Sequence, residues 1–225
     1  MDGLERVTSW VRARPPSCGP VRLVAVDGHA GSGKSTFTRR LAAALGEAAT
    51  PVLHLDDLAT HEELFAWTDR VLTQVITPLA HSRTAHYTPY DWVRRGFGPP
   101  HPLPAAPVVL VEGVGAGRRA LRPYLAGLLW MDRAAEDSWR RGRTRDGREQ
   151  SAFWDGWTVA ETRHFASDPS RPFAHALIRE IPLGYAVRPG PAAPPGPHRK
   201  ITLSSDTPGT YQAVGNLTEE GRNSA

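Results

Sequence analysis

The chain has 225 residues, of which 40% are hydrophobic and 22% are charged, and its formal net charge is +4. This length suits one sizeable α/β domain or two small ones, and the composition is typical of a globular protein with a core. No run of about 18 apolar residues occurs, which excludes a transmembrane helix. The single Cys18 excludes an intrachain disulfide and a multi-cysteine zinc site. Because no secretory signal is evident either, we expect a cytoplasmic protein with no membrane partner.

Apolar strand-like segments and helical patterns alternate along the chain. In chain order we expect a helix at 2–14, a strand at 21–26, a helix at 33–45, a strand at 52–55 and a helix at 61–79. After a long loop at 81–106 we expect a strand at 108–111, a helix at 117–125, a strand at 128–131, helices at 134–145 and 151–165, and a strand at 174–178. This alternation predicts a mostly parallel sheet of about five strands with helices on both faces.

The composition changes after Arg188, where Pro, Gly, Ser and Thr dominate and apolar periodicity is lost. Such a segment buries too little apolar surface to offset the entropy of ordering. We therefore expect one domain at 1–188 and a disordered tail at 189–225. The sequence does not predict the oligomeric state.

The segment GHAGSGKS, which begins at Gly28, matches the G-x-x-x-x-G-K-[ST] pattern of a phosphate-binding loop. It stands between an expected strand and an expected helix, which is the context that such a loop requires. Glycines let successive N–H groups turn towards phosphate oxygens, and the following helix adds its positive N-terminal end. We expect this loop to bind ATP through Gly28, His29, Ala30, Gly31, Ser32, Gly33, Lys34, Ser35 and Thr36.

Within this loop, Lys34 would reach the β- and γ-phosphates, and the Ser35 hydroxyl would bind Mg²⁺. Glu112 follows four apolar residues, so it lies at the carboxyl edge of a buried strand, where ligands bind in open α/β sheets. Asp56 and Asp57 end another strand, and either suits a general base that takes the proton of an acceptor hydroxyl. Since adjacent strand residues point to opposite faces, we expect only one of the two to face the cleft.

Two other classes of phosphate-loop protein do not fit this sequence. GTPases read guanine with an Asn-Lys-x-Asp segment, but neither of the two lysines, Lys34 and Lys200, is followed by such an Asp. Motor ATPases usually need a longer chain and a strand that ends in Asp-Glu, whereas here the strand ends in Glu112 alone. The pattern therefore favours phosphoryl transfer to a small molecule.

Five arginines lie within ten residues, at positions 140, 141, 143, 145 and 148. Helical spacing places Arg141 and Arg145 on one face, where guanidinium groups could stabilise charge on a transferring phosphoryl group. The cluster could instead be a solvated basic face or an RNA-binding helix. It lacks the interleaved aromatic residues of common RNA modules, so we expect no nucleic-acid partner.

Between residues 20 and 180 the chain resembles the uridine kinase family of P-loop kinases, whose relatives include pantothenate kinase and phosphoribulokinase. Four segments carry the resemblance, namely DGHAGSGKST at 27–36, HLDD at 54–57, VVLVEG at 108–113 and WRRGRTRD at 139–146. The resemblance implies a P-loop NTPase fold, a three-layer α/β/α sandwich, with a lid at about 139–150.

The resemblance also implies roles at matching positions. Asp56 would be the general base, Glu112 the carboxylate associated with Mg²⁺, and Arg141 and Arg145 the lid arginines. We favour Asp56 over Asp57 mainly for this reason.

Other segments match the family less closely. The segment Tyr90-Asp91-Trp92 resembles an aromatic-Asp-aromatic stretch that contacts the nucleoside in uridine kinases, and Asp57 is a further candidate for substrate contact. The closing segment at 167–178 departs from the family pattern, because His175 stands where the family usually has Asp.

The sequence thus predicts an ATP- and Mg²⁺-dependent kinase that phosphorylates a hydroxyl group of a small molecule, with a nucleoside such as uridine or cytidine favoured. Two alternatives stay open at this point. The acceptor could be a pantothenate-like acid, a sugar or an antibiotic. The chain could also be a regulatory protein that binds a nucleotide and hydrolyses it slowly or not at all.

Overall fold

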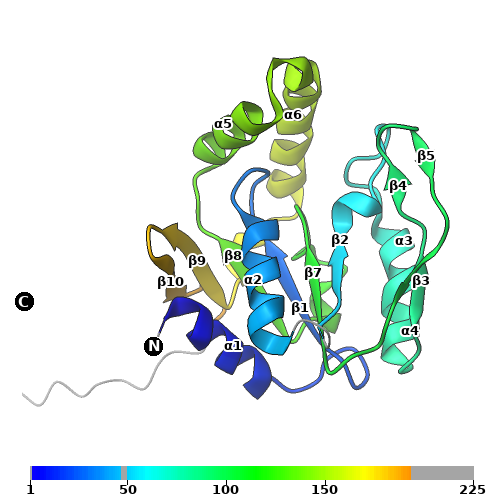
Figure 1. Ribbon diagram of the computed structural model, residues 1–225, viewed down its shortest axis with the longest axis vertical. Helices are drawn as coiled ribbons and strands as arrows, with labels where there is room; N and C mark the ends of the chain where they lie inside the picture. Colours follow the sequence, from blue (N-terminus) through cyan, green and yellow to red (C-terminus); the bar gives the residue numbers. More distant parts are fainter. Residues whose placement is uncertain (1, 47–49, 194–225) are drawn as a thin grey trace, which may run out of the picture. The chain divides into compact units, whose positions relative to one another are not determined.

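The computed structural model describes residues 2–46 and 50–193. At its centre lies a six-stranded sheet in the order β10-β9-β8-β1-β7-β2 (Figure 1). The strands are β1 (Arg22–Asp27), β2 (Val52–His54), β7 (Val108–Glu112), β8 (Gly127–Met131), β9 (Ala176–Ile181) and β10 (Gly184–Pro189). Neighbouring strands pair in parallel except β9 and β10, which pair antiparallel. The predicted α/β class and the mostly parallel sheet are confirmed.

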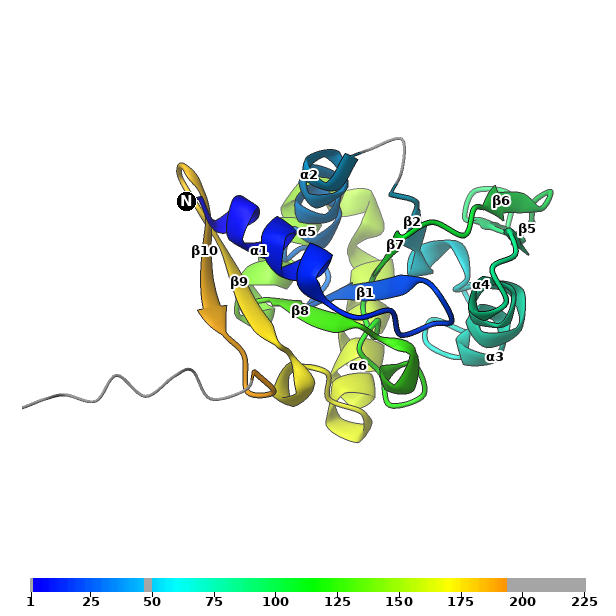
Figure 2. The same cartoon turned by 90° about the horizontal axis from the view of Figure 1, so that it is seen from below.

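Helices cover both faces of this sheet. The α-helices of the described residues are α1 (Gly3–Ala13), α2 (Lys34–Gly46), α3 (Thr68–Val71), α4 (Thr77–Ala80), α5 (Ala135–Asp146) and α6 (Ser151–Ser167). Figure 2 shows α1 and α2 on one side of the sheet and α6 on the other. The predicted three-layer arrangement is therefore present.

The residues of β1 illustrate how one strand supplies two cores. Val24 and Val26 are fully buried and pack with Phe37 of α2. Leu23 and Ala25, also fully buried, pack in the opposite core. Successive side chains of a strand point to opposite faces. A continuous apolar run therefore marks a strand that is covered on both sides.

The sequence predicted a long loop after α4, but this connection also contains strands. It contains two small antiparallel ribbons, one of β3 (Ala85–Tyr87) with β6 (His101–Leu103), the other of β4 (Tyr90–Asp91) with β5 (Gly96–Phe97). These strands have only two or three residues each, too few for an apolar alternation to be visible in the sequence.

The helix predicted at 61–79 begins only at Thr68, and residues 72–76 form a π-helical turn. Side-chain hydrogen bonds hold the preceding segment in another conformation. The guanidinium of Arg118 donates to the carbonyl of Phe65 at 2.8 Å, and the Thr60 hydroxyl accepts the N–H of Glu63 at 2.9 Å. The carbonyl of Phe65 thus bonds to a side chain that lies far away in the sequence.

The prediction of an α-helix at 117–125 is also wrong. This segment forms turns that end in a short 3₁₀ helix, Arg122–Tyr124. The backbone N–H of Gly117 is held by the buried Asp27 carboxylate at 2.9 Å. Pro123 lacks the N–H that an α-helix interior needs for its backbone hydrogen bonds.

The sheet has one strand more than the five expected, since β10 returns antiparallel beside β9. The folded unit also extends to Ala193, beyond the predicted boundary at 188. Pro189 pairs with Ala176, and the N–H of Gly190 donates to the carbonyl of His175 at 2.9 Å. The rest of the predicted tail, 194–225, lies outside the described residues. Among the described helices, none combines the length and apolarity needed to cross a membrane.

Candidate active site

A buried carboxylate at the end of β1 ties the phosphate loop to the sheet. Asp27 Oδ1 accepts the N–H groups of Gly28 at 2.7 Å and Gly115 at 2.9 Å, and Oδ2 accepts that of Gly117 at 2.9 Å. Burial raises the pKa of Asp27, and the side chain of Ser170 and the backbone N–H groups of Gly117 and Gly28 oppose that shift. Asp27 therefore joins the phosphate loop to the loop that follows β7.

The backbone of the phosphate loop requires glycine at three positions. Gly28, Gly31 and Gly33 have φ angles of +146°, +82° and +102°, a region that L side chains rarely adopt. Gly31 carries a second constraint, because a Cβ atom there would overlap the carbonyl oxygen of Ser138 in α5. The loop is thus packed directly against α5.

We expect the substitution Gly31→Ala to lower the free energy of unfolding by about 2 kcal/mol or more, because it adds backbone strain to a clash with backbone atoms. The Tm of thermal unfolding and the ATP affinity measure the effect, and both should be lower than in the wild type. The control is Gly156→Ala in α6, where a Cβ meets nothing within 4 Å. That helical change should stabilise the protein slightly. A Gly31→Ala variant with the wild-type Tm would contradict this reading of the loop.

The polar side chains at the carboxyl edge of the sheet lie next to one another. The Ser35 hydroxyl donates to Glu112 Oε1 at 3.0 Å, and His54 Nδ1 lies 2.6 Å from the same oxygen. Lys34 Nζ donates to the carbonyls of Gly28 and His29 at 3.0 and 3.1 Å. The sequence-based pair of Ser35 and Glu112 is thus brought together in space.

Ser35 and Glu112 offer the oxygen atoms that Mg²⁺ prefers. Their oxygens lie 3.0 Å apart. A magnesium ion that is held largely by phosphates and water needs only one or two protein ligands of this kind. Within 2–46 and 50–193, no group of three or more His, Cys, Asp or Glu side chains forms a metal cage of protein ligands alone. The residues present therefore fit a magnesium ion that arrives with a nucleotide.

The charges at this edge shift one another's protonation. Burial acts to raise the pKa of Glu112, but the hydrogen bond from His54 and the charge of Lys34 outweigh it, so that pKa is lowered. The same hydrogen bond raises the pKa of His54. Glu112 is therefore held ionised, as a ligand of a divalent cation must be.

Asp56 and Asp57 have the opposite shift. Enclosure by protein and the negative charges of Glu112 and Asp57 raise the pKa of Asp56, although its side chain stays open to the cavity. Burial also raises the pKa of Asp57, against the hydrogen bond that it accepts from the Tyr87 hydroxyl at 3.3 Å. A carboxyl group with a raised pKa is a better proton acceptor once ionised.

The expectation that only one of these aspartates faces the cleft is wrong. Strand β2 ends at His54, and residues Leu55–Asp57 form a 3₁₀ turn, so strand alternation does not apply to them. Both Asp56 and Asp57 line the same cavity.

That cavity, of about 780 Å³, lies between the phosphate loop, the 3₁₀ turn after β2, and helices α5 and α6. Most of the predicted site residues line it, namely Ala30, Gly31, Gly33, Lys34, Ser35, Thr36, Asp56, Asp57, Trp92, Glu112, Arg141 and Arg145. Gly28, His29 and Ser32 belong to the loop but do not line the cavity. Four aromatic side chains also line it, namely His61, Phe153, Trp154 and Trp157.

Two predicted substrate residues do not line the cavity. The Tyr90 side chain is buried, and its hydroxyl lies 3.0 Å from His61 Nδ1. Asp91 Oδ1 accepts the N–H groups of Val93 and Arg94, both at 2.9 Å, and so stabilises a turn. Of the Tyr90-Asp91-Trp92 segment, Trp92 alone reaches the cavity wall.

The two arginines predicted to act on phosphate line the cavity on one face of α5. Arg141 Nη1 donates to Glu180 Oε2 at 2.7 Å, and Arg145 pairs with Asp146 at 2.6 Å. Glu180 belongs to β9 and also pairs with Arg133 at 3.2 Å. Sequence reasoning missed Glu180, because β9 was expected to end at 178.

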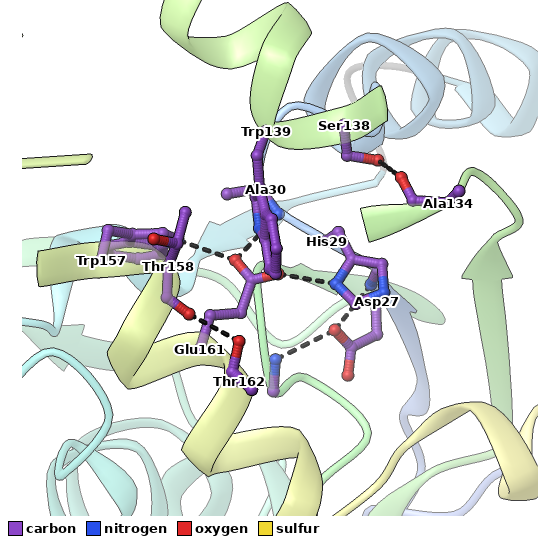
Figure 3. A network of polar contacts seen from close by, with 12 residues as sticks. Asp27, His29, Ala30, Ala134, Ser138, Trp139, Trp157, Thr158, Glu161 and Thr162 are labelled. Atoms are coloured by element: carbon purple, nitrogen blue, oxygen red, sulfur yellow. Dashed lines mark hydrogen bonds and ion pairs between the residues drawn. The ribbon is translucent and has the colours of Figure 1, made fainter. Parts of the chain in front are cut away.

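Sequence reasoning also missed Glu161 of α6, which is fully buried beside the phosphate loop (Figure 3). Its two oxygens lie within hydrogen-bond distance of donors on the phosphate loop, on α5 and on α6. An acidic residue in a helix rich in tryptophan gave no signal, and its partner His29 lies 132 residues away.

The comparison with solved structures supports the architecture. No family model and no curated protein sequence matches the chain. A solved structure described as a possible uridine kinase, from Bacillus stearothermophilus, superposes with a TM-score of 0.52 at 15% identity, over 72% of this chain and 93% of that one. The chain shares the fold of that structure.

A second solved structure superposes equally well. It is provisionally described as a fructose transport system kinase, from Silicibacter sp. TM1040, with a TM-score of 0.54 at 21% identity, over 71% of this chain and 88% of that one. The superpositions show a shared fold. At identities this low, substrate and activity have to be argued from the chemistry of the site.

Proposed function

We propose that the protein is an ATP- and Mg²⁺-dependent kinase that transfers the γ-phosphoryl group to a hydroxyl group of a small molecule. One observation carries the proposal. The carboxylates of Asp56 and Asp57 open into the same cavity as Lys34, Ser35 and the phosphate loop. A phosphate cradle beside a pair of candidate bases is what transfer to a hydroxyl requires.

In this proposal the phosphate loop and Lys34 bind the nucleotide phosphates, and Ser35 and Glu112 hold Mg²⁺. The metal would neutralise charge on the phosphate oxygens. Asp56 accepts the proton of the acceptor hydroxyl as that oxygen bonds to the γ-phosphorus, and the bond from this phosphorus to the bridging oxygen of ADP breaks, so that ADP leaves. Arg141 and Arg145 face the cavity and stabilise negative charge on the transferring group.

The acceptor that we propose first is a nucleoside such as uridine or cytidine. Trp92, Phe153 and Trp157 line the cavity, and their rings follow one another at centroid distances of 5.9 and 5.8 Å. Such faces bind a planar or ring-shaped molecule well. Sugars, pantothenate-like acids and hydroxylated antibiotics are the other acceptors that this chemistry admits.

The test is release of ADP from ATP across a panel of nucleosides, sugars and other hydroxyl compounds, with and without EDTA. An acceptor should raise ADP release strongly, and EDTA should abolish the effect. The matched control for uridine is 5′-deoxyuridine, which lacks the hydroxyl but keeps the base. ADP release that is independent of every acceptor would contradict a kinase. ATP binding without turnover would favour the regulatory alternative.

A further inference from the structure

The buried carboxylate of Glu161 stands out among the charged groups that the proposed reaction does not use. Its side chain has no exposed surface. Burying a carboxylate is costly unless hydrogen bonds replace its hydration. A carboxylate at such a position is therefore expected to hold the groups that donate to it in place.

Four donors surround Glu161, and they come from three parts of the chain (Figure 3). Oε1 lies 2.7 Å from His29 Nδ1 and accepts the indole N–H of Trp139 at 3.0 Å. Oε2 accepts the backbone N–H of Ala30 at 3.1 Å and the indole N–H of Trp157 at 2.7 Å. His29 and Ala30 belong to the phosphate loop, Trp139 to α5 and Trp157 to α6.

Electrostatics favours the ionised form of this carboxylate. Burial acts to raise the pKa of Glu161, but the hydrogen bond from His29 and the charge of Lys34 outweigh burial and lower it. The anion at Glu161 is therefore matched by donors on the loop that would bind phosphate.

Backbone packing joins the same three parts at neighbouring points. Gly31 lies so close to α5 that a Cβ atom would overlap the carbonyl of Ser138. One turn further along α5, Gly142 lies so close to α6 that a Cβ atom would overlap the ring of Trp154. Glycine thus lets α5 fit between the phosphate loop and α6, with Glu161 at the centre of the junction.

We propose that Glu161 is a positioning residue, which clamps the phosphate loop to α5 and so sets the place of Arg141 relative to the bound phosphates. Arg141 lies two residues beyond Trp139, and its guanidinium lies close to Gly33 of the loop. This inference rests on the proposed nucleotide site. It means that α5 as far as Gly142 belongs to the preformed phosphate site, and that any lid closure takes place beyond Gly142.

The test is a double-mutant cycle on ATP affinity with the full chain. Glu161→Gln keeps the shape but turns an amide NH₂ towards N–H donors, so we expect ATP to bind about tenfold more weakly. Arg141→Ala should weaken ATP binding by a similar factor. If Glu161 acts through Arg141, the double variant should lose far less than the product of the two losses.

Trp139→Phe provides a milder variant in case Glu161→Gln folds poorly, because it removes one donor and keeps an aromatic ring at that position. It should shift ATP affinity in the same direction by a smaller factor and show the same coupling to Arg141→Ala. The control is Glu136→Gln, the same chemical change at an exposed position of α5, which should leave ATP affinity unchanged.

Multiplicative losses in both cycles would overturn the proposal, because a residue that only stabilises the fold would weaken binding independently of Arg141. Wild-type ATP affinity in Glu161→Gln would overturn it as well. The readout is nucleotide binding, so it stays informative if no acceptor is found. In that case the kinase proposal fails while the clamp is still tested.

Discussion

Replacing Lys34 with alanine is expected to reduce phosphoryl transfer by about 10²- to 10³-fold or more, the scale seen when one preorganised donor to developing charge is lost. Lys34 is the lysine of the phosphate-loop pattern and lines the cavity. Its ammonium group donates to two loop carbonyls and pairs with no carboxylate of the described residues, so the charge is available for phosphate. Steady-state turnover and ATP affinity measure the loss.

The fold should survive this change, because the Lys34 ammonium contacts loop carbonyls at the cavity and not the apolar core. The matched control is Arg39→Ala, which removes a positive charge from an exposed position of the same helix. We expect that variant to keep wild-type turnover. Near-normal turnover in Lys34→Ala would exclude the proposed role of the loop.

Replacing Asp56 with asparagine is expected to lower turnover by about 10²-fold or more, the usual loss when a general base is removed. ATP affinity should change little, because Lys34 and the loop amides that we assign to the nucleotide phosphates remain. Asp57→Asn is the comparison, since both carboxylates line the cavity and Asp57 is also bound by the Tyr87 hydroxyl. If Asp57→Asn is inactive and Asp56→Asn is active, the base has been assigned to the wrong residue.

The raised pKa of Asp56 gives this assignment a second test. The base must be ionised, so kcat/KM should rise with pH through a pKa above the ordinary value of about 3.9. Enclosure by protein raises this pKa most, the charges of Glu112 and Asp57 raise it further, and the charges of Lys34 and His54 lower it. In Asp56→Asn that rise should disappear from the pH profile.

Stability should move in the opposite direction to activity. A carboxyl whose pKa is higher in the folded than in the unfolded state binds its proton more tightly when folded. Folded stability therefore falls as pH rises from the unfolded-state pKa to the folded-state pKa, and the cost is fully present above the folded-state pKa. Asp56→Asn removes this cost, so its Tm at pH 7 should equal or exceed that of the wild type. A Tm well below the wild type would mean that Asp56 has a structural role.

The parts of the fold that the sequence predicted are those with a strong local signal. Four consecutive apolar residues before Glu112 marked a strand buried on both faces, and the glycine pattern from Gly28 marked the turn from β1 to α2. Both signals reflect physical demands that neighbouring residues satisfy by themselves.

The parts that the sequence did not predict depend on contacts between distant residues. The segment before Thr68 is held by Arg118, and the position of Asp56 and Asp57 depends on a turn that begins one residue earlier than expected. Tyr90 and Asp91 resemble substrate contacts, but their polar groups are occupied by His61 and by a turn. No local pattern shows which partners such side chains will find.

The buried Glu161 is the clearest example of this limit. Its four donors become neighbours only when β1, α5 and α6 have packed together. A glutamate among tryptophans in a helix predicts a partly exposed position on average. The network around it follows from tertiary packing, and therefore so does the role that we propose for it.

The central claim is that this chain moves a phosphoryl group from ATP to a hydroxyl group. The most direct measurement uses ATP with a radioactive γ-phosphate, together with Mg²⁺ and the acceptor that stimulates ADP release. It determines which product carries the radioactive label. The account predicts that the label appears in a phosphate ester of the acceptor, one for each ADP formed, and that Lys34→Ala and Asp56→Asn lose this product. Label that appears only as inorganic phosphate, at a rate unaffected by these two substitutions, would contradict it.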